Sequence, residues 1–126
     1  MALYYDLPIY KDTYRLLRAT SVLIQNFPRD QKYAIGQEMR TEIKEMVRCI
    51  FRANQTLDKD PWLIRFAEQL EFLKLDFRTC VDDRLITPEQ QANAWEFIDS
   101  IGKQLNGWKN SLNKNSAGPT LFDNPS

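Results

Sequence analysis

The feature that most constrains the fold of this 126-residue chain is a set of four long stretches in which apolar residues recur every three or four positions. That spacing matches the 3.6-residue repeat of an α-helix, so each stretch places its apolar side chains on one face. Prolines separate the stretches, standing at positions 8, 28, 61, 88, 119 and 125. No segment shows the alternating pattern of a β-strand, and the sequence therefore predicts an all-α fold.

The first stretch predicts a helix that begins near Leu7-Pro8, with Asp6 as its N-cap, and ends before Phe27-Pro28. Its expected apolar stripe consists of Tyr10, Tyr14, Leu17, Ser21 and Ile24, with Leu16, Leu23 and Phe27 on its flank.

The second stretch predicts a helix from about Asp30 to Asn54. Its apolar face is expected to consist of Ile35, Met39, Ile43, Met46, Ile50 and Ala53.

The last two stretches carry clear helix-start signals. Asp60, followed by Pro61, is the expected N-cap of the third helix, and Thr87-Pro88-Glu89-Gln90 reads as a capping box that opens the fourth. The fourth helix is expected to end near Asn113. The apolar faces are Leu63, Phe66, Leu70, Leu73, Phe77 and Cys80 in the third helix, and Trp95, Ile98, Ile101, Leu105, Trp108 and Leu112 in the fourth.

Four helices of similar length joined by short connections favour antiparallel neighbours. We therefore predict an up-down-up-down four-helix bundle over residues 1–113. The remaining residues, 114–126, are rich in Asn, Ser, Gly and Pro, and we predict a flexible, disordered tail there.

The residue types needed for most catalytic and metal sites are missing from the sequence. The chain contains no histidine, so it has no imidazole base and no His-containing metal set, and it lacks phosphate-binding glycine loops. We expect no enzyme activity, cofactor or metal site. Cys49 and Cys80 both lie in apolar-periodic segments and are interpreted as buried free thiols, with a disulfide as the alternative. The absence of a long apolar run and of a signal-like N-terminus predicts a cytoplasmic protein with no membrane partner.

Basic residues form a ridge along the second predicted helix. Lys and Arg equal Asp and Glu overall, at 17 each, but residues 1–57 carry a net +3 and the remainder −3. Helical spacing aligns Arg40, Lys44, Arg48 and Arg52, and Arg29 and Lys32 extend the line. With Lys11, Arg15 and Arg18 of the first helix, this ridge could contact phosphates, especially if several subunits combine. The alternative is a solvated face paired to Glu38, Glu42 and Glu45.

Several short motifs resemble a known family. They are Leu7-Pro8-Ile9-Tyr10-Lys11, Asn26-Phe27-Pro28-Arg29, Lys32-Tyr33, Ile35-Gly36, Arg40, Arg52-Ala53-Asn54 and Gly107-Trp108-Lys109. Over roughly residues 7–112 the chain resembles the four-helix-bundle family that includes the accessory variability determinant of diversity-generating retroelements. A sister branch is encoded in intervening sequences of 23S ribosomal RNA genes.

The resemblance implies a homopentamer that binds RNA or DNA and associates with a reverse transcriptase, without enzymatic activity. It places Arg29, Lys32 and Arg40 on the functional surface and gives Tyr33, Ile35 and Gly36 structural roles; Lys44, Arg48 and Arg52 join the predicted site through their ridge spacing. The alternative function is a structural or protein-interaction bundle with little nucleic-acid affinity, which zero net charge permits. Its contact points would be surface aromatics such as Phe72.

Overall fold

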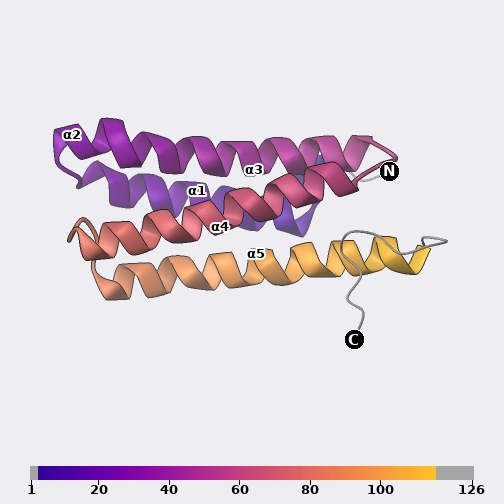
Figure 1. Cartoon of the computed structure of the whole chain (residues 1–126). Helices are drawn as coiled ribbons and strands as arrows, with labels where there is room; N and C mark the ends of the chain where they lie inside the picture. Colours follow the sequence, from indigo (N-terminus) through magenta and orange to yellow (C-terminus); the bar gives the residue numbers. More distant parts are fainter. Residues whose placement is uncertain (1–2, 116–126) are drawn as a thin grey trace.

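The computed structural model describes residues 3–115, and these form helices joined by short turns (Figure 1). The elements are η1 (Tyr4–Asp6), α1 (Pro8–Gln25), α2 (Arg29–Gln31), η2 (Lys32–Gly36), α3 (Gln37–Gln55), α4 (Asp60–Asp82) and α5 (Pro88–Asn115). The described residues contain no strand, so the predicted all-α fold is confirmed.

The four long helices lie side by side as a bundle. Helix α3 packs against α1 and α4, and α5 closes the bundle by packing against the same two helices. Figure 1 shows successive long helices running in alternate directions, as the short connections require. The arrangement gives α3 two long grooves, one shared with α1 and the other with α4.

The apolar faces predicted for the second and third helices are correct. Every residue predicted for the face of α4 is buried. Of the set predicted for the second helix, the residues in α3 are buried and only Ile35, in η2, is half-buried. In α5 the central residues Ile98, Ile101 and Leu105 are buried, while the two tryptophans pack at the edge of the core.

The apolar stripe predicted for the first helix is rotated about the helix axis relative to the face of α1 that is buried. The side chains of α1 that face the core are Ile9, Thr13, Leu16, Thr20 and Ile24. Thr13 fits the interior because its hydroxyl donates to the Ile9 carbonyl at 2.7 Å. Tyr14, which was predicted to face inward, is instead 47% exposed. The sequence pattern predicted the wrong face because α1 buries two threonines, which were classed as polar, and exposes a tyrosine, which was classed as apolar.

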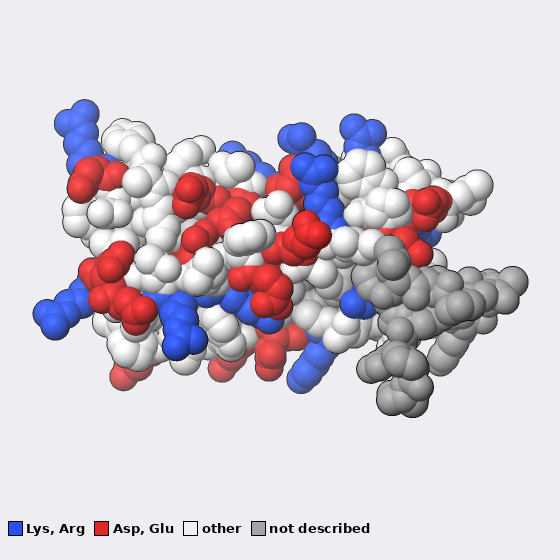
Figure 2. Space-filling view, in the orientation of Figure 1, with Lys and Arg blue, Asp and Glu red and all other residues white. Residues whose placement is uncertain are grey.

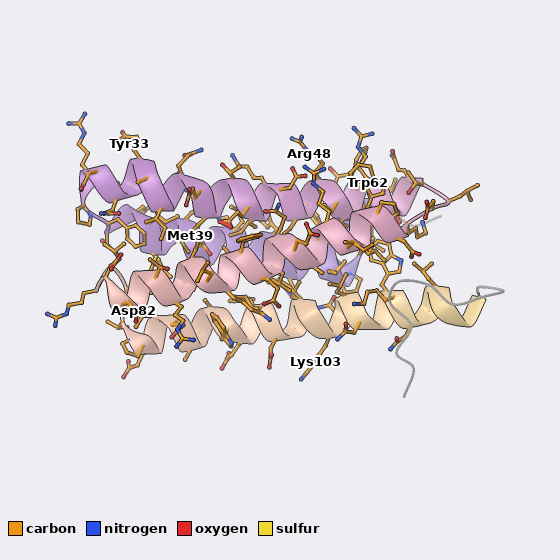
Figure 3. All side chains as sticks on the ribbon, in the orientation of Figure 1. Tyr33, Met39, Arg48, Trp62, Asp82 and Lys103 are labelled. Carbon is orange, nitrogen blue, oxygen red and sulfur yellow. The ribbon has the colours of Figure 1, made fainter. Side chains whose placement is uncertain are left out.

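The second predicted helix is continuous from residue 29 to residue 55 but contains one wider turn. Residues 32–36 form a π-helical turn, η2, between α2 and α3. Gly36 is buried here, and a Cβ at this position would lie 2.8 Å from Ile24 Cγ2. Gly36 therefore lets the start of α3 approach the end of α1, as its predicted structural role requires. Tyr33 is 75% exposed within the single chain and projects outward (Figure 3).

Helix starts agree only partly with the predicted caps. Thr87 and Gln90 form the predicted capping box, with Gln90 N donating to Thr87 Oγ1 at 3.1 Å and Thr87 N donating to Gln90 Oε1 at 2.9 Å. The predicted caps Asp6 and Asp60 are wrong, because the N-cap positions are Leu7 and Lys59 and neither makes a side-chain cap bond. Helix α5 continues to Asn115, and the rest of the predicted tail, residues 116–126, lies outside the described residues.

A polar cluster joins the first and last helices. Asp12 of α1 accepts hydrogen bonds from Ser100 Oγ at 2.9 Å and Gln104 Nε2 at 2.6 Å, both on α5. Arg15 also pairs with Asp12, at 2.9 Å. Partial burial alone would raise the pKa of Asp12, but the hydrogen bonds from Ser100, Gln104 and Arg15 outweigh it and lower that pKa.

Candidate nucleic-acid interface

The groove between α1 and α3 gathers positive charge, and we call it the basic groove. Its two adjoining sections share Gln25 and Arg40, and the larger has a volume of about 390 Å³. Its lining consists of Tyr14, Leu17, Arg18, Ser21, Ile24, Gln25, Lys32, Tyr33, Gln37, Arg40 and Lys44. Three of the predicted site residues, Lys32, Arg40 and Lys44, are therefore brought together. None of the described residues that line the basic groove is acidic.

Arg18 joins this groove from α1, and it is one of the three cations of the first helix that were predicted to add to the basic ridge. It is exposed and lines the same section as Arg40 and Lys44. Arg18 lies one helical turn after Tyr14, so the two side chains share a face of α1. Which residues of α3 lie opposite that face depends on the rotation of α1, which the sequence did not reveal. The cross-helix group of Arg18, Arg40 and Lys44 is thus a product of packing.

Arg40 lies at the centre of the basic groove with an uncompensated charge. Its side chain is half-buried, and its Nε atom is buried without a hydrogen-bond partner. No carboxylate among residues 3–115 lies within ion-pair distance of its guanidinium. A half-buried, unpaired guanidinium is a suitable partner for a phosphate group.

The other predicted site residues are separated from this group. The α3 ridge turns gradually around the helix, and Arg48 pairs with Glu45 at 3.8 Å. Arg52 reaches the α4 side, where its guanidinium lies 5.9 Å from the Trp62 ring centroid and 6.0 Å from that of Phe51. Figure 3 shows Arg48 and Trp62 near the same end of the bundle. Arg29 is exposed at the opposite end and lines neither section of the basic groove.

The groove on the other side of α3 has the opposite charge, and we call it the acidic groove. It lies between the first half of α3 and the second half of α4 and has a volume of about 810 Å³. Its acidic lining residues are Glu38, Glu42, Asp76 and Asp83, accompanied by the exposed rings of Tyr33 and Phe72. In Figure 2, acidic side chains gather where α3 and α4 meet, while basic ones lie along the upper edge, over α3.

The interaction of Glu42 with Asp76 explains why Glu42 does not neutralise the basic ridge of α3. Burial, a hydrogen bond with Asp76, and the negative charges of Asp76 and Glu38 raise the pKa of Glu42 to about 9. Glu42 is therefore protonated at neutral pH. The alternative interpretation, in which Glu38, Glu42 and Glu45 pair with the ridge, is correct only for Glu45, which binds Arg65 at 2.8 Å as well as Arg48.

Neither cysteine has the surroundings of a nucleophile. Cys49 and Cys80 are buried free thiols, as predicted. Burial raises the pKa of Cys49 to about 11 and, with nearby Asp76 and Asp83, that of Cys80 to about 12. The thiolate forms that attack substrates or bind metals are thus disfavoured. Within residues 3–115, no group of three or more acidic or cysteine side chains is arranged to hold a metal ion.

None of the described helices combines the length and the apolarity that crossing a membrane requires.

Comparison with known protein families places the chain in a family of helical proteins. Residues 7–112 match the bAvd-like family, the helical accessory variability determinants of diversity-generating retroelements. No curated protein sequence matches the chain.

Proposed function

We propose that this chain, which belongs to the bAvd-like family of retroelement accessory proteins, binds nucleic acid along its basic groove. The observation that carries the proposal is the cluster of Arg18, Arg40 and Lys44 in a groove without acidic lining residues. Cations from two helices can contact successive phosphates of one strand, and such contacts release bound counterions. Zero net charge does not oppose this role, because the negative charge lies elsewhere on the surface, including the acidic groove.

The proposed role is that of a non-enzymatic accessory protein. Family membership supports an oligomer, a pentamer by resemblance, and association with a reverse transcriptase. In an oligomer the same groove would occur once per subunit. The phosphate contacts would then add, so that modest affinity per subunit yields strong total binding.

A salt titration tests nucleic-acid binding directly. Fluorescence anisotropy with a labelled strand should show the logarithm of the association constant falling linearly with the logarithm of salt concentration. Arg40→Ala and Lys44→Ala should each weaken binding and reduce the steepness of that line by roughly one phosphate contact.

Arg78→Ala and Lys103→Ala are matched controls. Both residues are exposed, on α4 and α5, and neither lines the basic groove. Light scattering on each variant would establish that its assembly is intact. Equal losses in the groove variants and the controls would contradict the proposal, because a diffuse charge effect would then suffice.

The acidic groove favours a second function, the binding of a partner protein. Phe72 is 58% exposed and Leu75 is 56% exposed beside it, which is unusual for two large apolar side chains of one helix. Phe72→Ala with Leu75→Ala should abolish capture of a purified reverse transcriptase and leave strand binding unchanged. Unchanged capture by this double variant would contradict the second function.

A further inference from the structure

Tyr14 is placed on the outer side of α1, where it lines the basic groove beside Arg18, Arg40 and Lys44. Nearly half of its surface is exposed. A large aromatic ring is stabilised by burial, so an outward tyrosine among cations needs a reason other than core packing.

The packing of α1 shows that Tyr14 lies outside although polar residues occupy core positions of the same helix. Thr13 and Thr20 take the core positions, and the buried hydroxyl of Thr20 has no hydrogen-bond partner. A buried polar atom without a partner reduces stability. The helix therefore keeps its threonines inside and Tyr14 outside despite a cost, and such departures from simple patterning are typical of functional surfaces.

Other aromatic rings hold Tyr14 in position. Its ring lies nearly parallel to that of Tyr10, with centroids 6.3 Å apart and an interplanar angle of 15°. Tyr10 meets Tyr4 edge to face at 5.4 Å, and Tyr4 meets Phe51 in the same manner at 5.1 Å. A ring fixed by its neighbours loses little conformational freedom when a second flat group binds to it.

The aromatic cluster continues the basic groove. A neighbouring depression is lined by Tyr4, Phe51, Lys44 and Arg48, so Lys44 lines both it and the basic groove. Tyr5, which is 48% exposed, meets the ring of Tyr4 at 5.4 Å. Cations and aromatic rings thus line two adjoining depressions on this side of the molecule.

We infer that the basic groove binds single-stranded nucleic acid, with one base stacked on Tyr14 and the adjoining phosphates beside Arg18, Arg40 and Lys44. Duplexes hide their base faces, whereas single strands expose them, and stacking on aromatic rings with cations along the backbone is how single strands are bound without sequence preference. The inference rests on the proposed function and adds the form of nucleic acid that is bound.

The test compares strands that have equal phosphate numbers but different access to base faces. The probes are a labelled mixed-sequence strand of about 12 nucleotides, as RNA and as DNA, its duplex, and an abasic strand of the same length. Affinities per strand are measured by anisotropy across a salt series. We expect the base-containing single strand to bind about tenfold more tightly than the duplex or the abasic strand.

Tyr14→Ala should remove about that tenfold preference without changing the salt dependence. Tyr14→Trp should restore it, because an indole also stacks. The matched control is Phe72→Ala, which removes a ring of comparable exposure, 58% against 47% for Tyr14, from the acidic groove and should leave strand binding unchanged. If RNA binds more tightly than DNA, the groove also contacts the ribose hydroxyl. If both bind equally, stacking and phosphate contacts account for the binding. Both outcomes support the inference.

Two results would overturn the inference. If duplex and abasic strands bind as tightly as the base-containing strand, and Tyr14→Ala matches the parent protein, then the proposed function stands and the stacking role fails. If no probe binds even at low salt, then the proposed function fails and the inference fails with it.

Discussion

Glu42 of α3 and Asp76 of α4 both line the acidic groove, and their interaction, together with burial, raises the pKa of Glu42 to about 9. One oxygen of each carboxyl group, Glu42 Oε1 and Asp76 Oδ2, is buried and has no hydrogen-bond partner. A proton on Glu42 supplies the missing donor and removes the repulsion between two close negative charges. The contact between α3 and α4 is therefore coupled to pH.

Glu42→Gln should stabilise the protein at mildly alkaline pH. The pKa of Glu42 is about 9 in the folded state, above its ordinary value, so the folded chain holds a proton that the unfolded chain releases. Stability from this group is complete below the ordinary pKa and is lost as pH rises toward 9. At pH 8 the amide should raise the free energy of unfolding by about 1 kcal/mol, or a few degrees in Tm.

Thermal unfolding between pH 5 and 9 measures this effect. The parent protein should lose Tm more steeply with rising pH than Glu42→Gln does, because the amide cannot ionise. Glu96→Gln, at an exposed position on α5, is the control and should keep the parent slope. Parallel curves for all three proteins would contradict the proton-sharing contact.

Asp12→Asn should weaken the attachment of α5 to α1. It removes a charge that accepts hydrogen bonds from Ser100, Gln104 and Arg15, with an expected loss of about 1–2 kcal/mol at pH 7. Since the folded-state pKa of Asp12 is lowered, its contribution is present above the ordinary pKa and is lost as pH falls through the folded value. Urea unfolding should show a difference between variant and parent that is smaller at pH 3 than at pH 7. If the free energies of unfolding of variant and parent differ by the same amount at both pH values, the loss comes from altered side-chain shape and not from the missing charge.

Gly36→Ala and Gly102→Ala should have opposite effects. The new methyl group at residue 36 would meet Ile24 Cγ2 at 2.8 Å, whereas nothing lies within 4 Å of the corresponding position at residue 102. Overpacking should cost the first variant about 1–3 kcal/mol, and helix propensity should stabilise the second by up to about 1 kcal/mol. Denaturant titration of both variants provides the measurement. A neutral result at residue 36 would mean that Ile24 moves aside freely.

The thiols of Cys49 and Cys80 should react slowly in the folded protein. Both are buried, and their raised pKa values of about 11 and about 12 leave little thiolate at pH 8. Labelling with a chromogenic disulfide reagent should therefore follow the rate of unfolding and become rapid in denaturant. Fast labelling of the folded protein would show that the core opens locally.

Much of the fold could be predicted because α3 and α4 follow one rule. Their buried residues are apolar, spaced three and four apart, and uninterrupted, so Phe66 and Phe77 could be placed in the core from spacing alone. Helix α1 does not follow the rule, because two of its buried residues are threonines. Thr13 donates its hydroxyl to the Ile9 carbonyl, and the Thr20 hydroxyl is buried without a partner; residue type reveals neither arrangement.

The candidate site could be predicted only in part for the same reason. The ridge of Arg40 and Lys44 follows from periodicity within one helix, but the approach of Arg18 depends on how α1 is rotated against α3. The pairing of Glu42 with Asp76 depends on the register between α3 and α4. Distances between helices are set by packing, and no spacing along the chain encodes them directly.

Positive and negative charge are divided between the two sides of α3, although the net charge of the molecule is zero. Attraction and repulsion from the two grooves would turn the protein as a polyanion approaches, before any contact forms. The strand would then arrive at the α1 side and leave the α4 side facing away. The orientation of the protein on the strand would then decide which of its surfaces remains accessible to a further partner. Net charge alone does not determine that orientation.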